Sequence, residues 1–187
     1  MPAYAATINV TTPNDVIAND GLCSLREAVI AANTNAVSGA AAGECVAGDP
    51  VATAVDTINL PAGTYTLTIA APVAVAPAVG TIEDWYEPSL VEPLIPYVLG
   101  TDPNAAVGDL DLTESVNIVG AGMATTIVNG GDLDRVFQIV ADPVTATTTI
   151  NVGISNLTAR DGQVGWAQIT PGDLVLDSYW LFKKLGG

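Results

Sequence analysis

Histidine is absent from this chain of 187 residues, and basic residues are scarce. Five Lys and Arg against 20 Asp and Glu leave a formal net charge of −15 at pH 7. Binding to nucleic acid requires clustered Lys and Arg, so nucleic acid is not an expected partner. The negative charge also disfavours an anionic membrane surface, and the sequence has no apolar run of about 18 residues that could span a bilayer.

The residues that usually carry catalysis are also few, since charged residues make up only 13% of the chain. A polysaccharide lyase or hydrolase needs a basic residue beside bound calcium, or two carboxylates that face one groove. Here the bases are scattered along the chain and most of the acids fall in turn sequences. We therefore expect that the protein is not an enzyme, and a lyase or hydrolase is the least favoured of its functions.

The chain has only two cysteines, Cys23 and Cys45, which lie 22 positions apart. In an oxidising compartment they would form a disulfide, which would stabilise the fold by about 3 kcal/mol on the chain-entropy model. Two buried free thiols are the alternative interpretation. A metal site is a third, although two cysteines without any histidine support it poorly.

No cofactor is expected from the sequence. Two pairs of acids, Asp109 with Asp111 and Asp132 with Asp134, could bind calcium through carboxylate and carbonyl oxygens. Neither pair has the full ligand spacing of a known calcium loop, so solvated turn acids are the favoured interpretation.

One segment has a clear helix signal. Ser24 is a good N-cap residue, and Glu27, three positions later, completes a capping box. An apolar stripe follows at Leu25, Ala28, Val29 and Ala32, and the helix is expected to end near Asn33. Arg26 is expected to form a structural ion pair or to cap carbonyl groups, and not to belong to an active site.

Short strands separated by turn residues fill most of the remaining sequence. Strands are expected at Thr7 to Thr11, Ile58 to Leu60, Tyr65 to Ile69, Leu110 to Leu112, Val116 to Val119, Thr126 to Val128, Val136 to Val140, Thr148 to Val152 and Ile154 to Thr158. Strands this short, with turns this frequent, favour an all-β solenoid over a sandwich. The helix at Ser24 to Ala32 is expected to cover the bare edge of the first coil.

These patterns predict one structural domain with three parts. Residues 1–55 are expected to form an N-terminal cap that holds the helix and the cysteine loop. Residues 56–163 would form the coils, interrupted at 70–108 by an insertion with six prolines, which cannot lie within a central strand ladder. Residues 164–187 are expected to form a separate C-terminal tail.

The block from Cys23 to Asn33, CSLREAVIAAN, resembles the CSLREA-type N-terminal region of bacterial secreted and surface proteins. The flanking segments Asn19 to Gly21 and Asp56 to Tyr65 fit the same resemblance, as do the later segments Val116 to Gly122 and Gly153 to Gly162. The resemblance implies a right-handed parallel β-helix with an N-terminal capping helix. It also implies a capping module of exported, often adhesin-like proteins.

We expect an extracellular or cell-surface structural or adhesive protein. Its copies would associate head to tail into a filament, by strand addition at the open edge of the last coil. The expected contact residues are Trp85, Tyr86, Tyr97, Trp180 and Phe182. The alternative is a carbohydrate or host-surface binding module, in which Trp85, Tyr86 and Tyr97 stack on sugar rings.

The N-terminal sequence bears on the expected location. Ala3-Tyr4-Ala5 has the small-x-small pattern of a signal-peptidase site, but no basic or apolar signal region precedes it. An arbitrary alanine-rich start is an equally good interpretation of this pattern taken alone. Together with the resemblance, it favours a secreted protein from which the signal peptide has been removed.

Overall fold

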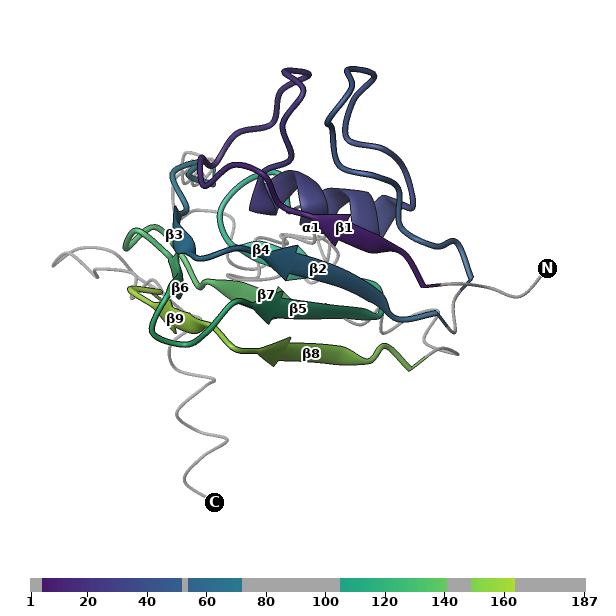
Figure 1. Cartoon of the computed structure of the whole chain (residues 1–187). Helices are drawn as coiled ribbons and strands as arrows, with labels where there is room; N and C mark the ends of the chain where they lie inside the picture. Colours follow the sequence, from purple (N-terminus) through teal and green to yellow (C-terminus); the bar gives the residue numbers. More distant parts are fainter. Residues whose placement is uncertain (1–4, 52–53, 72–104, 141–148, 164–187) are drawn as a thin grey trace, which may run out of the picture.

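The computed structural model describes residues 5–51, 54–71, 105–140 and 149–163 (Figure 1). The described chain contains one helix, α1 (Leu25–Thr34), between the first and second strands. The strands are β1 (Thr7–Asn9), β2 (Asp56–Leu60), β3 (Gly63–Thr66), β4 (Leu110–Leu112), β5 (Val116–Gly120), β6 (Thr126–Asn129), β7 (Phe137–Ile139), β8 (Val152–Ser155) and β9 (Thr158–Arg160).

The described strands form three small parallel sheets. The first sheet has the order β1-β2-β5-β8, the second β3-β6-β9, and the third β4-β7. Every pair is parallel, so strands that are neighbours in a sheet are separated by long stretches of sequence. Figure 1 shows β1, β2, β5 and β8 stacked one below the next, with α1 beside the β1 end of the stack.

The registers place like residues in columns that run across the strands. In the first sheet, Ile8 pairs with Ile58, Ile58 with Ile118, and Ile118 with Ile154. The first three side chains are fully buried, whereas Ile154 on the last strand is 41% exposed. Each inner isoleucine is covered by the next member of its column, so burial ends where the column ends.

Helix α1 packs against β1, β2 and β4 and contributes directly to the hydrophobic core. Its buried side chains include Leu25, Ala28 and Val29, in agreement with the apolar stripe in the sequence. At its C-terminal end, the Asn33 side chain donates a hydrogen bond to the Asp111 carbonyl (2.7 Å) and accepts one from the Thr113 amide (3.0 Å). These two bonds attach the helix to β4.

The predicted fold class requires a correction. The sequence predicted an all-β, right-handed parallel β-helix with an N-terminal capping helix. The helix is present, but the described strands form three separate small parallel sheets, and no solenoid is shown. The period-2 alternation of each strand correctly reports which side chains point inward. It carries no information on how the strands are grouped into sheets, and it does not show that a helix shares their core.

The boundaries of the last two strands also differ from the prediction. Strands were expected at Thr148 to Val152 and at Ile154 to Thr158, whereas β8 runs through position 153 and β9 starts only at Thr158. The chain turns instead at Asn156, which adopts a left-handed backbone conformation with φ of 55°. Asparagine tolerates this conformation better than most residues. Because the chain turns at Asn156, Gly153 lies within β8.

Within the described ranges, the helix is not long and apolar enough to cross a membrane.

The hydrophobic core joins the helix to the strands. It includes residues from α1 as well as from strands β1 to β6. The cap and the sheets are therefore joined by one core. The insertion at 70–108 and the tail at 164–187 lie mostly or wholly outside the described residues.

Candidate assembly surface

The end of the sheets that is covered by α1 is held closed by the helix N-terminus. The Ser24 hydroxyl accepts a hydrogen bond from the Glu27 amide (3.1 Å), and the Glu27 carboxylate accepts one from the Ser24 amide (2.9 Å). The predicted capping box is present. The Glu27 carboxylate also accepts from the Ala18 amide (2.8 Å), and the Ser24 hydroxyl donates to the Val16 carbonyl (2.7 Å). The cap thus fixes both the helix and the segment before it.

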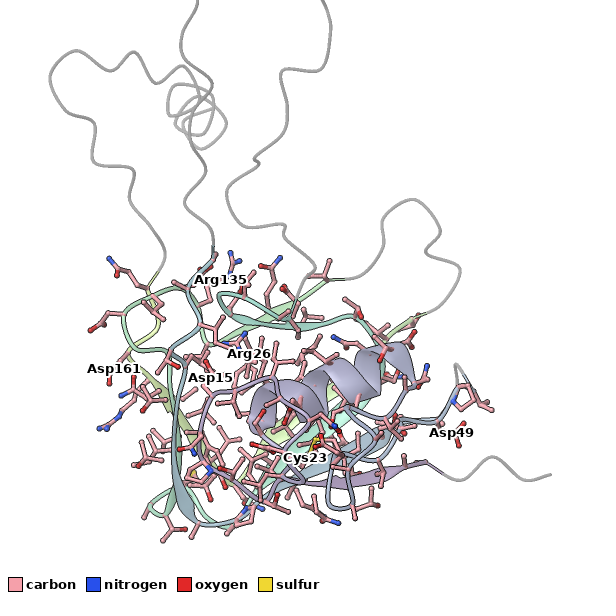
Figure 2. The ribbon with its side chains drawn as sticks, turned by 90° about the horizontal axis from the view of Figure 1, so that it is seen from above. Asp15, Cys23, Arg26, Asp49, Arg135 and Asp161 are labelled. Carbon is pink, nitrogen blue, oxygen red and sulfur yellow. A yellow bond between two sulfur atoms is a disulfide. The ribbon has the colours of Figure 1, made fainter. Side chains whose placement is uncertain are left out.

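A disulfide between Cys23 and Cys45 closes the same end, which confirms the predicted pairing over the free-thiol and metal alternatives. Both cysteines are almost fully buried, and Figure 2 labels Cys23 beside the helix. The bridge joins Cys23, which precedes the N-cap residue Ser24, to the loop after the helix. The loops on either side meet as well, since the Glu44 carboxylate accepts a hydrogen bond from the Gly21 amide (2.8 Å).

An ion pair of Arg26 and Asp15 with buried side chains lies at the same end (Figure 2). The Arg26 Nε and Asp15 Oδ1 atoms are 2.6 Å apart, and a second bond joins Arg26 Nη2 to Asp15 Oδ2 at 3.0 Å. The side chains are 0% and 3% exposed, respectively. Such two-point contact fixes the guanidinium orientation as well as its charge. A structural role for Arg26 was expected from the sequence, but its partner was not identified.

The same pair holds the two ends of the 72–104 segment together. Arg26 donates to the carbonyls of Ala105 (2.8 Å) and Gly108 (2.9 Å), where the described chain resumes. Asp15 accepts from the amides of Thr68 (2.6 Å) and Ile69 (3.0 Å), just before the segment begins. The Gly108 amide also donates directly to the Ile69 carbonyl (2.8 Å). The chain therefore leaves and re-enters the core at adjacent points.

The surroundings of Asp15 shift its titration. Burial by itself would raise the pKa of Asp15, but the hydrogen bond from Arg26, the Thr68 and Ile69 amides and the Arg26 charge together lower that pKa. Asp15 therefore remains a carboxylate below the pH at which an ordinary aspartate is protonated. An open groove of about 380 Å³ lies beside it, lined also by Pro13, Asn14, Val16, Thr64, Thr66 and Thr68. The one carboxylate that lines this groove, that of Asp15, is bound to Arg26.

The opposite end of the sheets is built differently. Strands β7, β8 and β9 are each the last strand of their sheet, and each has a neighbour on one side only among the described strands. Exposure is high here, at 57% for Ile139 and 41% for Ile154, while Phe137, Val152 and Leu157 are only partly buried. Among the described strands, this end therefore has edges with no further strand beside them, next to exposed apolar side chains, and such an edge can accept another chain.

Two of the four aspartates considered for calcium, Asp109 and Asp111, are buried and are not the solvated turn acids expected from the sequence. The Asp109 carboxylate binds the guanidinium of Arg135 at 2.8 Å, and Asp111 is buried. In the described ranges, no group of three cysteines or acids is arranged to hold a metal ion. Asp132 adopts a left-handed turn conformation with φ of 57°, which fits the interpretation of this residue as a turn acid.

The predicted partner-contact residues lie outside the described residues. These are Trp85, Tyr86 and Tyr97 in the insertion, and Trp180 and Phe182 in the tail. The carbohydrate-binding alternative depends on the first three, so it stays a prediction. The open edge and the Asp15 contacts were not assigned to residues by sequence analysis. The residues Pro13-Asn14-Asp15 are typical of a turn, but nothing in them shows that Asp15 reaches Arg26.

Comparison with protein-family models, with curated proteins and with solved structures found no match to this chain. The resemblance of the Cys23 to Asn33 block to exported surface proteins thus remains an expectation from sequence.

Proposed function

We propose that this protein is an extracellular structural or adhesive protein whose copies associate through the open edge formed by β7, β8 and β9. The observation that carries the proposal is that the two ends of the sheets differ. Helix α1 packs against the first strands, whereas the last described strands of all three sheets are exposed. Strand addition from another chain satisfies such an edge with backbone hydrogen bonds.

Two further observations support an extracellular location. The Cys23–Cys45 disulfide persists only where the surroundings are oxidising, as they are outside the cell. The resemblance of the Cys23 to Asn33 block to exported surface proteins points the same way. A structural role also fits the described groove, whose carboxylate serves the ion pair.

Sedimentation velocity of the oxidised full-length chain over a wide range of concentration tests the proposal. We expect a monomer at low concentration and larger species as concentration rises. Ile154→Lys places a charge on the open edge and should weaken this association at least tenfold. Thr57→Lys, with the same added charge on the outer face of the inner strand β2, is the matched control and should associate like the wild type.

A strictly monomeric wild-type chain at the highest concentration would overturn the proposal. Equal loss of association in Ile154→Lys and Thr57→Lys would also count against it, because the effect would then come from net charge and not from the edge. Negative-stain electron microscopy of the associated species shows whether filaments form, as expected from the sequence.

A further inference from the structure

The direction of the backbone groups at the open edge follows from the hydrogen bonds on the paired side. In a parallel ladder, the residues of one strand alternate between bonding the neighbour and facing away from it. The Val116 amide donates to the Asn151 carbonyl (3.0 Å), so the alternate residues Val152 and Ile154 direct their backbone groups away from β5. By the same alternation, the Gly130 amide bonds the Arg160 carbonyl (2.9 Å), and Ala159 faces away from β6.

The third sheet ends in the same way. The Leu110 amide donates to the Val136 carbonyl (3.1 Å), and the Val140 amide donates to the Leu112 carbonyl (3.0 Å). Phe137 and Ile139 therefore direct their backbone groups away from β4. Within β7, β8 and β9, the residues that direct their backbone groups to the open edge all have uncharged, apolar side chains; they are Phe137, Ile139, Val152, Ile154 and Ala159.

The distribution of charge favours contact at this end between two like chains. Two copies carrying −15 each repel one another, so they approach best where the net negative charge is lowest. The described residues up to position 51, which form the α1 end, contain five acids and one base, Arg26. The described residues 130–140 and 149–163, which include β7, β8 and β9, contain three acids and two bases, and one of these bases, Arg160, lies 3.4 Å from Asp161.

The α1 end does not offer a matching set of edges for a head-to-tail contact. Helix α1 packs against β1, β2 and β4, and two loops of the first 51 residues project beyond the helix on this side (Figure 1). The helix and the loops would prevent a second copy stacked on this end from bringing its own β7 and β9 beside a strand. Helix α1 packs against β4 there, whereas β1 and β3, which are also first strands of their sheets, each have one strand neighbour among the described strands.

We infer that two copies associate end to end through their open edges, related by a two-fold axis, as an isologous pair. This inference rests on the proposed function and names its partner, a second copy of the same chain. A two-fold axis places the same surface on both sides, so all three exposed strands contribute on each copy. Strands from the two copies then run antiparallel across the contact. A closed pair of this kind cannot extend into a filament.

Thiol cross-linking of the full-length, oxidised chain separates the two geometries. Ser155→Cys places an exposed thiol on β8, and Asn9→Cys places one on β1; both positions belong to one column of the first sheet. A short bis-maleimide is added to Ser155→Cys alone, to Asn9→Cys alone, and to a mixture in which one variant carries a size tag. Val37→Cys, 61% exposed in the loop after α1, measures chance collisions.

An isologous pair predicts a covalent dimer from Ser155→Cys alone, at least tenfold above the Val37→Cys level, and no enrichment of the mixed Asn9–Ser155 product. Enrichment of the mixed product would overturn the isologous pair in favour of a head-to-tail filament, while leaving association through the open edge intact. A monomer without any cross-link, as expected if residues 164–187 of the same copy cover the edge, would overturn both proposals.

Discussion

The two ends of the sheets are made of similar residues but are terminated by different means. At the α1 end, the helix packs against β1, β2 and β4, and a capping box, a disulfide and a buried ion pair fix the helix and the loops beside it. At the end formed by β7, β8 and β9, the described strands stop with apolar side chains and backbone groups exposed. The difference shows that closing a parallel sheet takes long-range contacts from outside the sheet, which the strands themselves cannot supply.

The largest difference between the two ends should appear when their ion pairs are broken. Asp15→Asn leaves the fully buried Arg26 guanidinium without its counter-charge, so the free energy of unfolding should fall by about 3–5 kcal/mol. At the other end, Arg160→Met removes an exposed pair and should change it by less than about 1 kcal/mol. Urea unfolding of the oxidised variants measures both, and similar losses would contradict the comparison.

A second comparison uses one column of isoleucines that spans both ends. Ile118→Ala removes a fully buried side chain and should cost about 2–5 kcal/mol, because a cavity replaces packed atoms. Ile154→Ala is the matched change one strand further on, at a position that is 41% exposed, and should cost less than half as much. Comparing the thermal unfolding midpoints of the two variants with that of the wild type measures both losses of stability. Equal losses would mean that Ile154 is covered in solution.

Removing the disulfide should have an effect of intermediate size. Replacing both Cys23 and Cys45 by serine should lower the free energy of unfolding by about 3 kcal/mol. The disulfide links residues 22 positions apart and so restricts the conformations of the unfolded chain, which become available again in the variant. A reducing agent should lower the stability of the wild type by a similar amount and leave the double variant unchanged. Loss of stability in the variant on reduction would show that another cause is at work.

The smallest expected effect is the dependence of stability on acid. The folded state lowers the pKa of Asp15, so the stabilisation that this carboxylate provides is fully present above the pKa of an unfolded aspartate. It is lost as pH falls through the lower pKa of the folded state. The free energy of unfolding should therefore decline in strongly acidic solution, and the decline should be shallower in an Asp15→Asn, Arg26→Met double variant. Identical acid limbs would exclude a contribution from Asp15.

The local elements of the fold could be predicted from sequence, because each depends on neighbours a few residues apart. Ser24 and Glu27 set the start of α1, and the Cys23–Cys45 pairing followed from two cysteines in a chain with an expected oxidising location. Most of the short strands were placed within a few residues by their alternating apolar side chains. These features need no knowledge of which distant segments meet.

Long-range geometry was the part that sequence patterns could not supply. The grouping of strands into three sheets depends on registers between residues such as Ile58 and Ile118, which lie 60 positions apart. The same holds for Asp15, whose partners Arg26, Thr68 and Ile69 come from separate stretches of the chain. At β8, the predicted boundary between Val152 and Ile154 was wrong, because β8 continues to Ser155 and the chain turns at Asn156.

The adjoining positions of Ile69 and Gly108 have a practical consequence for protein engineering. Because the Gly108 amide donates to the Ile69 carbonyl at 2.8 Å, the points where the chain leaves and re-enters the core are adjacent, whatever the length of chain between them. The entropy cost of closing a loop grows only slowly with loop length, so a short glycine linker or a foreign domain inserted between these two residues should leave the rest of the protein stable. This pair of positions is therefore a suitable insertion site for displaying other sequences.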